Sequence, residues 1–258
     1  MTRASKIIDE QCLSTAWAKA FLATVEHPEV SPLVVTVTGM HDGLPTESAA
    51  VREPLDADLR EQVRFDVNTV ANTIFPSSLW NPSLPRTSLF ERYLRILPEI
   101  RKCHRPGKAS LANPYGVYFQ RLIAYQGSDG NQLEYIIRTY AKGNHRFSDL
   151  QASILDPKAD HKNQRTRGFP CLQQVAFQPM GKNQLAIIGF YPKQHLYERG
   201  YGNYLGLCRL GRFMAHEMGL EFSQMTCFVG VGVHGKVKKP KLSGLIGAIK
   251  RVVGEEQQ

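Results

Sequence analysis

The sequence lacks any long, uninterrupted apolar run. Its 258 residues contain no window of about 18 consecutive apolar residues, the length at which a segment becomes a candidate transmembrane helix. The first stretch, MTRASKIIDEQCLSTAWAKAFLATV, has acidic residues before its apolar part and lacks the order of a secretion signal. We therefore expect a cytoplasmic protein that has no contact with membranes.

Cysteine is scarce, and its spacing excludes two further classes of protein. The number is odd and no Cys-x-x-Cys pair occurs, which argues against a disulfide framework or a structural zinc site. We expect reduced thiols and no metal site. The five cysteines are Cys12, Cys103, Cys171, Cys208 and Cys227.

The glycine-rich stretches GVGVHG and RGYGNYLG lack the spacing of the common nucleotide-binding loops. Positive charge, in contrast, is in excess: 32 Lys and Arg against 23 Asp and Glu give a net charge of +9, which favours an anionic ligand or partner. Because part of this excess lies in residues 236–258, nucleic acid is a possible partner of that tail. Its cations are Lys236, Lys238, Lys239, Lys241, Lys250 and Arg251.

Helix and strand signals follow one another without regular βα alternation, which predicts an α+β fold. We expect one domain over residues 1–235, followed by a basic tail with a short helix over 236–258. Gly206 and Gly211 indicate that the longest helix packs closely against a neighbour. We predict helices at 14–25, 87–102, 131–143 and 201–219, strands at 31–39, 150–156 and 225–235, and a β-hairpin at 171–193 around the turn MGKNQ.

Cys171 is the first candidate for chemistry. A lone cysteine is usually a small buried hydrophobe. Arg165 and Arg167 nevertheless lie close in sequence, and cations favour the reactive thiolate. Pro170 before the thiol and a strand after it would fix the backbone there. We therefore consider Cys171 a possible nucleophile.

Four polar residues each have a structural and a functional interpretation. Ser14 is a plausible N-cap, and Ser88 with Glu91 has the spacing of a capping box, although Glu91 could also be a general acid or base. Asn203 is either an N-cap or an amide that reads the edge of a heterocycle. His234 is either a satisfied core histidine or a residue at the border of a cleft.

The order of these features resembles the thymidylate synthase superfamily. The segments are FPCLQQVAF, a hairpin, GYGNYLGLCRLGRFMAHEMGL and the strand GVGVH; earlier, YGVYFQRL at Tyr115 is similar to the YGxQWRxW segment of that family. The resemblance covers about residues 70–235 and is most specific over 168–234. It implies a mixed sheet flanked by helices, with one sheet face forming the interface of a homodimer.

The resemblance also implies a reaction. Cys171 would add to C6 of a pyrimidine nucleotide or nucleoside, and C5 would accept a one-carbon unit from 5,10-methylenetetrahydrofolate. The product would be methylated or hydroxymethylated at C5, by covalent catalysis with acid–base assistance. Asn203, Tyr115 and His234 would bind the substrate, and Glu91 would transfer protons.

The chain departs from the family where the substrate phosphate would bind. Pro192 stands where the phosphate-binding arginine is expected, and FSDLQAS replaces the paired arginines given across the dimer. The cations that would replace them are Arg165, Arg167, Lys193 and His195. The alternative is a non-catalytic module of the same fold that binds a nucleotide, nucleic acid or protein.

Overall fold

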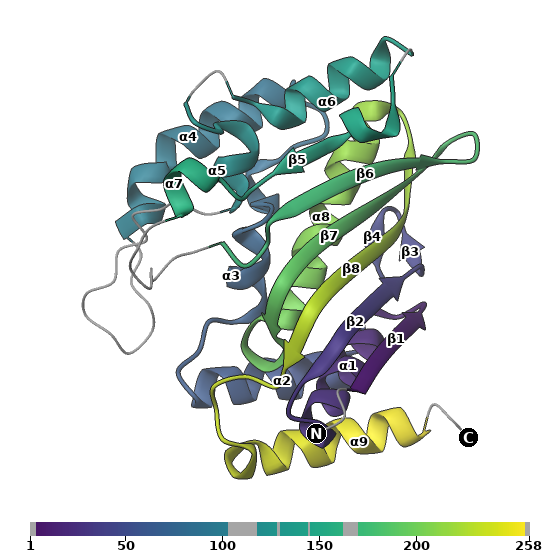
Figure 1. Ribbon diagram of the computed structural model, residues 1–258, viewed down its shortest axis with the longest axis vertical. Coiled ribbons are helices and arrows are strands. Elements are labelled where there is room, and N and C mark those ends of the chain that lie inside the picture. The colour runs from purple at the N-terminus through teal and green to yellow at the C-terminus, as the bar shows by residue number, and fades with distance from the viewer. Residues whose placement is uncertain (1–3, 103–117, 128–129, 144, 162–169, 256–258) are drawn as a thin grey trace.

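The computed structural model describes residues 4–102, 118–127, 130–143, 145–161 and 170–255 (Figure 1). These residues form a six-stranded sheet with the order β1-β2-β8-β7-β6-β5. The pairs β1–β2 and β7–β8 are parallel and the other neighbours are antiparallel. The strands are β1 (Ala4–Glu10), β2 (Val30–Val37), β5 (Gln151–Ser153), β6 (Gln174–Met180), β7 (Gln184–His195) and β8 (Glu221–Val233), with a separate pair β3 (Met40–His41) and β4 (Leu44–Pro45).

Helices cover one face of this sheet, which confirms the predicted α+β class. In Figure 1, α1 and α8 lie behind the strands, and α4 to α7 gather beside β5 and β6. The helices are α1 (Leu13–Glu26), α2 (Ala49–Glu61), α3 (Val67–Asn72), α4 (Arg86–Lys102), α5 (Tyr118–Ile123), α6 (Gln132–Ala141), α7 (Pro157–Asp160), α8 (Tyr201–Met218) and α9 (Ser243–Glu255).

The predicted hairpin and the long helix are both present. The strands β6 and β7 pair as far as Met180 and Gln184. In the turn between them, Gly181 has φ +55°, a left-handed conformation that glycine adopts without strain. The helix α8 ends at Gly219 in the same conformation, with φ +67°. A Cβ on Gly206 would lie 2.8 Å from the Ala71 oxygen in α3, so the two helices approach closely, as predicted.

All three predicted helix caps are wrong, because each helix begins earlier than its polar side chain suggested. α1 begins at Leu13, and the hydroxyl of Ser14 bonds to Tyr201 instead of to its own helix. α4 begins directly after Pro85, so Ser88 and Glu91 are interior residues. Asn203 is the third residue of α8, which starts without a side-chain cap.

The predicted helix of the basic tail is α9, and it packs against α1 and α2 at the bottom of Figure 1. Its apolar side chains Leu245 and Ile249 belong to the main hydrophobic core, together with Leu242 just before the helix. Lys250 and Arg251 remain exposed. Within the described ranges, no helix has the length and apolar character needed to cross a membrane.

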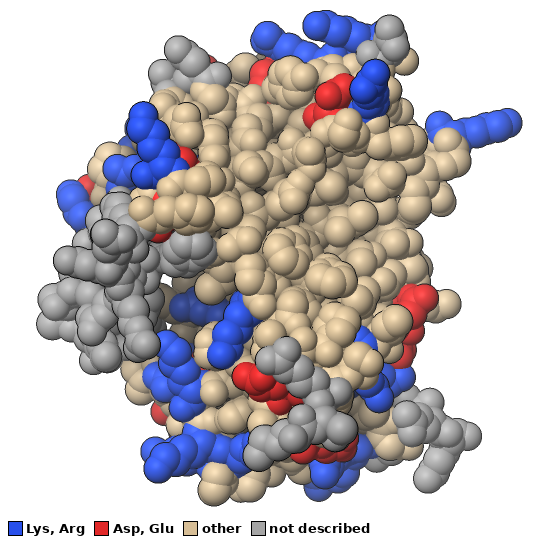
Figure 2. All heavy atoms as spheres, viewed as in Figure 1, with Lys and Arg blue, Asp and Glu red and all other residues tan. Residues whose placement is uncertain are grey.

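The other face of the sheet carries no described helix and faces the viewer in Figure 1. Figure 2 shows that few charged side chains lie over its centre. A row of side chains crosses it from β1 to β7, because Ile7 pairs with Val34, Val34 with Phe228, and Phe190 with Phe228. Ile7 is 79% exposed and Phe228 is 40% exposed. The centre of the open face therefore carries few charges and is partly apolar.

Candidate functional site

The parallel strands β7 and β8 end side by side, and this end of the sheet gathers several of the predicted residues. Lys193 is opposite Val231 and His195 is opposite Val233, so His234 directly follows the same row. Ligands of open sheets commonly bind at the carboxyl ends of parallel strands. Lys193, His195 and His234 thus share the end of the sheet at which a ligand is expected.

Cys171 lies beside this end of β7. The Gln173 N–H donates to the Phe190 oxygen at 2.9 Å, and Gln174 pairs with Phe190, so the residues just before β6 run alongside the end of β7. Pro170 and Leu172 are buried on either side of the exposed thiol. Buried neighbours therefore hold an accessible sulfur in place, as a nucleophile requires.

The other thiols differ from Cys171. Cys208 and Cys227 are completely buried, and burial raises the pKa of both far above the ordinary value of a thiol. A thiol that stays protonated and sealed is chemically inert. Cys12 is half-buried at the start of α1. Among the described cysteines, Cys171 is the accessible one.

Two tyrosines that the sequence did not single out, Tyr118 and Tyr191, lie close enough to Cys171 to interact with it electrostatically. Burial raises the pKa of Tyr118, and Cys171 adds to this effect, whereas Arg199 and the nearby N–H groups of Leu172 and Cys171 oppose it. Burial also raises the pKa of Tyr191 well above its usual range, with further contributions from Cys227, Tyr118 and Cys171. Both phenols therefore stay neutral near pH 7 and can donate hydrogen bonds.

The Tyr191 hydroxyl is buried and has no hydrogen-bond partner among the described residues. The polar side chains nearby do have hydrogen-bond partners. The Tyr204 hydroxyl donates to the Gln194 Oε1 at 3.1 Å, and the Gln194 Nε2 lies 3.9 Å from the Cys227 Sγ. These contacts join α8 to β7 and β8. Polar groups buried in a native core are normally paired. The Tyr191 hydroxyl shares the lack of a described partner with the Tyr93 hydroxyl on α4 and, at the same end of the sheet, with the His195 Nδ1.

Asn203 lies on the side of α8 that is between the sheet and α3. Tyr204, the next residue, contacts the sheet through Gln194, and Gly202, the residue before, packs on Val67 of α3. Because successive helical residues point about 100° apart, Asn203 points between these two directions and away from Tyr201, which faces α1. Its side chain is 4% exposed.

A cationic group surrounds His195. Burial lowers the pKa of His195, and Lys236, Lys193 and Arg199 lower it further, while Glu198 raises it. The imidazole is therefore neutral near pH 7. Arg199 also packs its guanidinium 5.1 Å from the centre of the Phe65 ring. Figure 2 shows Lys and Arg side chains gathered around a hollow at the lower left, near the start of β6.

Arg199 belongs to a single turn of π-helix, Leu196–Gly200, immediately before α8. Such turns are rare and occur frequently at functional sites. The sequence predicted Lys193 and His195 as ligands of an anion but missed Arg199 and Lys236. Their spacing from His195, four residues and 41 residues along the chain, gives no sign that all of them meet at the ends of β7 and β8.

Four other predicted residues are not brought to this site by any described contact. Glu91 is exposed on α4, and no hydrogen bond or ion pair joins it to another described residue. Tyr115, Arg165 and Arg167 lie outside the described residues. His234, in contrast, does lie at this end of the sheet. It is half-buried, and its backbone oxygen accepts a hydrogen bond from the Tyr197 N–H at 2.8 Å.

No protein-family model matches the chain, and no curated protein matches it either. We therefore infer the function from the residues themselves and from their arrangement at the end of the sheet.

Proposed function

We propose that the protein transfers a one-carbon group, methyl or hydroxymethyl, to C5 of a pyrimidine nucleotide or nucleoside. The observation that supports this most is the accessible thiol of Cys171 beside the neutral phenols of Tyr118 and Tyr191. A nucleophile beside neutral hydrogen-bond donors suits addition to a conjugated ring, because negative charge then develops on a ring oxygen.

The roles follow from the chemistry of the ring. The Cys171 sulfur forms a bond to C6, and the electron pair of the C5–C6 double bond moves toward the C4 substituent and makes C5 nucleophilic. After C5 has bonded to the one-carbon unit, loss of the C5 proton and expulsion of the Cys171 thiolate restore the double bond. Tyr118 and Tyr191 stabilise the developing charge, and Asn203 hydrogen-bonds the ring edge.

The anionic part of the substrate binds to the cationic group. Lys193 and Lys236 are exposed, and they flank the neutral imidazole of His195 together with Arg199. With the single carboxylate of Glu198 among three cations, the group has a surplus of about two positive charges, which suits a phosphate monoester. This arrangement replaces the arginine that the resemblance would require at Pro192.

The one-carbon unit would come from 5,10-methylenetetrahydrofolate. When bound, it would supply the carbon that C5 receives, and for a methyl product also the hydride that reduces this carbon, whereas for a hydroxymethyl product water would add to the carbon instead.

The protein is proposed to act as a homodimer that pairs the open faces of two sheets. The uncharged row around Phe190 and Phe228, whose rings lie 5.8 Å apart, would be covered in such a pair. A stable dimer buries roughly 1,600 Å² in total. Sedimentation of wild type and of Phe228→Lys tests this: the variant should sediment as a monomer, and an unchanged species would contradict the interface.

The reaction is tested by mass spectrometry of the intact protein. Incubation with 5-fluoro-dUMP or 5-fluoro-dCMP and 5,10-methylenetetrahydrofolate should yield an adduct on Cys171, because fluorine at C5 blocks the proton loss that releases the thiol. Cys12→Ala should still form the adduct and Cys171→Ala should not. Absence of an adduct with every pyrimidine nucleotide, together with full activity of Cys171→Ala, would overturn the proposal.

A non-catalytic binding function is the second candidate, and the exposed cations of the tail support it. Because Leu245 and Ile249 hold α9 in the core, deletion of the tail would also disturb the fold. Lys250→Gln with Arg251→Gln is therefore the sharper variant. Steep salt dependence of oligonucleotide binding that this variant weakens would support the function, and salt-independent or absent binding would exclude it.

A further inference from the structure

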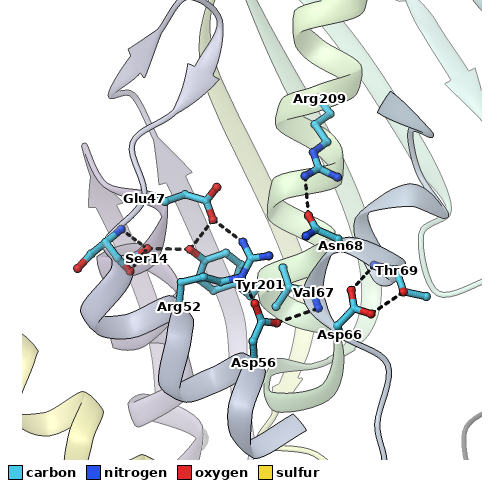
Figure 3. Close-up of polar contacts among 11 residues, drawn as sticks. Ser14, Glu47, Arg52, Asp56, Asp66, Val67, Asn68, Thr69, Tyr201 and Arg209 are labelled. Carbon is cyan, nitrogen blue, oxygen red and sulfur yellow. Dashed lines mark hydrogen bonds and ion pairs between the residues drawn. The ribbon is translucent and has the colours of Figure 1, made fainter. Parts of the chain in front are cut away.

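A hydrogen-bonded network on the helix side of the sheet surrounds Tyr201, the first residue of α8 (Figure 3). The Tyr201 hydroxyl donates to the Glu47 Oε2 at 2.7 Å, so the Ser14 hydroxyl, also at 2.7 Å, donates to Tyr201. The Ser48 N–H in turn donates to the Ser14 Oγ at 2.7 Å. This chain of bonds runs in one direction, and each bond polarises the next.

Arg52 extends the network to α2 and α3. Its guanidinium donates to Glu47 and to Asp56, at 2.6 Å in each case, and lies 5.1 Å from the centre of the Tyr201 ring. The second oxygen of Asp56 accepts from the Val67 N–H at 3.2 Å. Figure 3 shows Ser14 of α1, Glu47 of the segment before α2, and Arg52 of α2 converging on Tyr201. The network therefore connects the start of α8 to α1, α2 and α3.

The start of α8 needs such support. It continues the π-helical turn Leu196–Gly200 without a break, because Gly200 is itself helical with φ −53° and ψ −54°, and the two glycines Gly200 and Gly202 flank Tyr201 at this junction. Glycine lowers the stiffness of a helical turn because its backbone has more conformations to lose. The Tyr201 ring is 1% exposed and provides a rigid anchor in this turn.

Tyr201 and Asn203 lie about 200° apart around the same turn, so any rotation of this turn about the helix axis moves both side chains together. We infer that Ser14, Glu47 and Arg52 form a clamp on Tyr201 that positions Asn203 for reading the edge of the pyrimidine. The clamp residues are positioning residues, since they contact Tyr201 and not the ligand. This inference rests on the proposed function for its base-reading part.

The positioning is tested without any ligand by hydrogen exchange. Tyr201→Phe removes both bonds of the hydroxyl but keeps the ring against Trp17 and Arg52. Amides in the first turn of α8 should exchange about tenfold faster than in wild type. Tyr125→Phe is the matched control, since its hydroxyl donates to the Leu155 oxygen at 2.8 Å, outside α8. Unchanged exchange in Tyr201→Phe, or equal acceleration of this turn in both variants, would overturn the clamp.

Base reading is tested by the ratio of the dissociation constants for dUMP and dCMP. Tyr201→Phe should bring this ratio at least threefold closer to one, and Ser14→Ala should act in the same direction. Tyr125→Phe should keep the wild-type ratio. A wild type that binds neither nucleotide overturns the proposed function and the base reading together. A wild type that discriminates, with an unchanged ratio in Tyr201→Phe, overturns the positioning inference alone.

Discussion

The polar groups around Tyr201 and those around Cys171 are organised in opposite ways. In the clamp, Ser14, Glu47, Arg52 and Tyr201 all have partners at hydrogen-bonding distance. Around Cys171 the thiol is exposed, and the Tyr191 hydroxyl has no partner among the described residues. A paired network stabilises one arrangement of the chain, whereas unpaired donors leave hydrogen bonds for a ligand to form. The two regions should therefore respond differently to substitution.

The largest expected effect separates activity from stability at Cys171. Cys171→Ala should lower the rate of C5 transfer on the order of 10⁴-fold or more, because the covalent step disappears. Its free energy of unfolding should stay within about 0.5 kcal/mol of wild type, since the thiol is exposed. Enzyme assays and urea unfolding measure the two quantities. The buried control Cys208→Ala should lose about 1–2 kcal/mol of stability through the cavity that it leaves. Equal loss of stability in Cys171→Ala and Cys208→Ala would contradict the contrast between an exposed thiol and a buried one.

Two tyrosine substitutions test directly whether each buried hydroxyl has a hydrogen-bond partner. Tyr204→Phe should lower the free energy of unfolding by about 1–2 kcal/mol, because it leaves the buried Gln194 Oε1 without its donor. Tyr191→Phe should leave stability unchanged or raise it by up to about 1 kcal/mol, since it removes a buried hydroxyl that has no described partner. Urea unfolding of both variants measures the difference. A Tyr191→Phe protein as unstable as Tyr204→Phe would show that Tyr191 is paired after all.

Substitution in the clamp should cost stability. Arg52→Gln should lower the free energy of unfolding by about 1 kcal/mol, because Glu47 and Asp56 both lose a charged donor that is only 16% exposed. Lys102→Gln is the control, because it removes an ion pair on the surface: the side chains of Lys102 and its partner Glu99 are 71% and 73% exposed. This substitution should not measurably change the free energy of unfolding. Thermal unfolding at low and high salt compares them. Equal stability of the two variants would contradict the clamp.

The smallest effect concerns pH. The pKa of His195 is lowered in the folded protein, first by burial, from an ordinary value of 6.5. The unfolded chain therefore binds the proton more tightly, and His195 reduces stability as the pH falls below about 6.5. His195→Gln should be less sensitive to pH than wild type over that window, which urea unfolding at several pH values measures. An unchanged slope would place the imidazole in a more exposed, less cationic setting.

Local signals explain which elements could be predicted. The hairpin, the helix from Tyr201 to Gly219 and the last strand each have a periodic apolar pattern and a glycine at a turn or an end, so their positions follow from short stretches of sequence. The helix caps could not be predicted in this way. Ser14 has the residue type of a cap, but its hydroxyl bonds to Tyr201, which lies 187 residues away.

The candidate site was predictable only in part. Cys171 could be singled out from its flanking residues and Asn203 from its place at the start of the long helix, whereas Lys193 and His195 followed only from the resemblance to the thymidylate synthase superfamily. Tyr118 and Arg199 could not, because α5 and the π-helical turn meet Cys171 only through tertiary packing. Glu91 had a suitable position in the pattern, yet the fold leaves it exposed on α4.

The strand order has a consequence for synthesis and folding. β8 is the last strand in sequence, and it lies between β2 and β7 in the middle of the sheet. Until it has left the ribosome, β1–β2 and β7–β6–β5 are two separate half-sheets with unpaired backbone groups along the edges that β8 will join. Residues distant in sequence must then pair in one step, which slows folding. A chain that stops before Glu221 would expose the unpaired backbone edges of β2 and β7 and would lack the end of β8 that borders the candidate site. Truncated products of this protein are therefore candidates for aggregation.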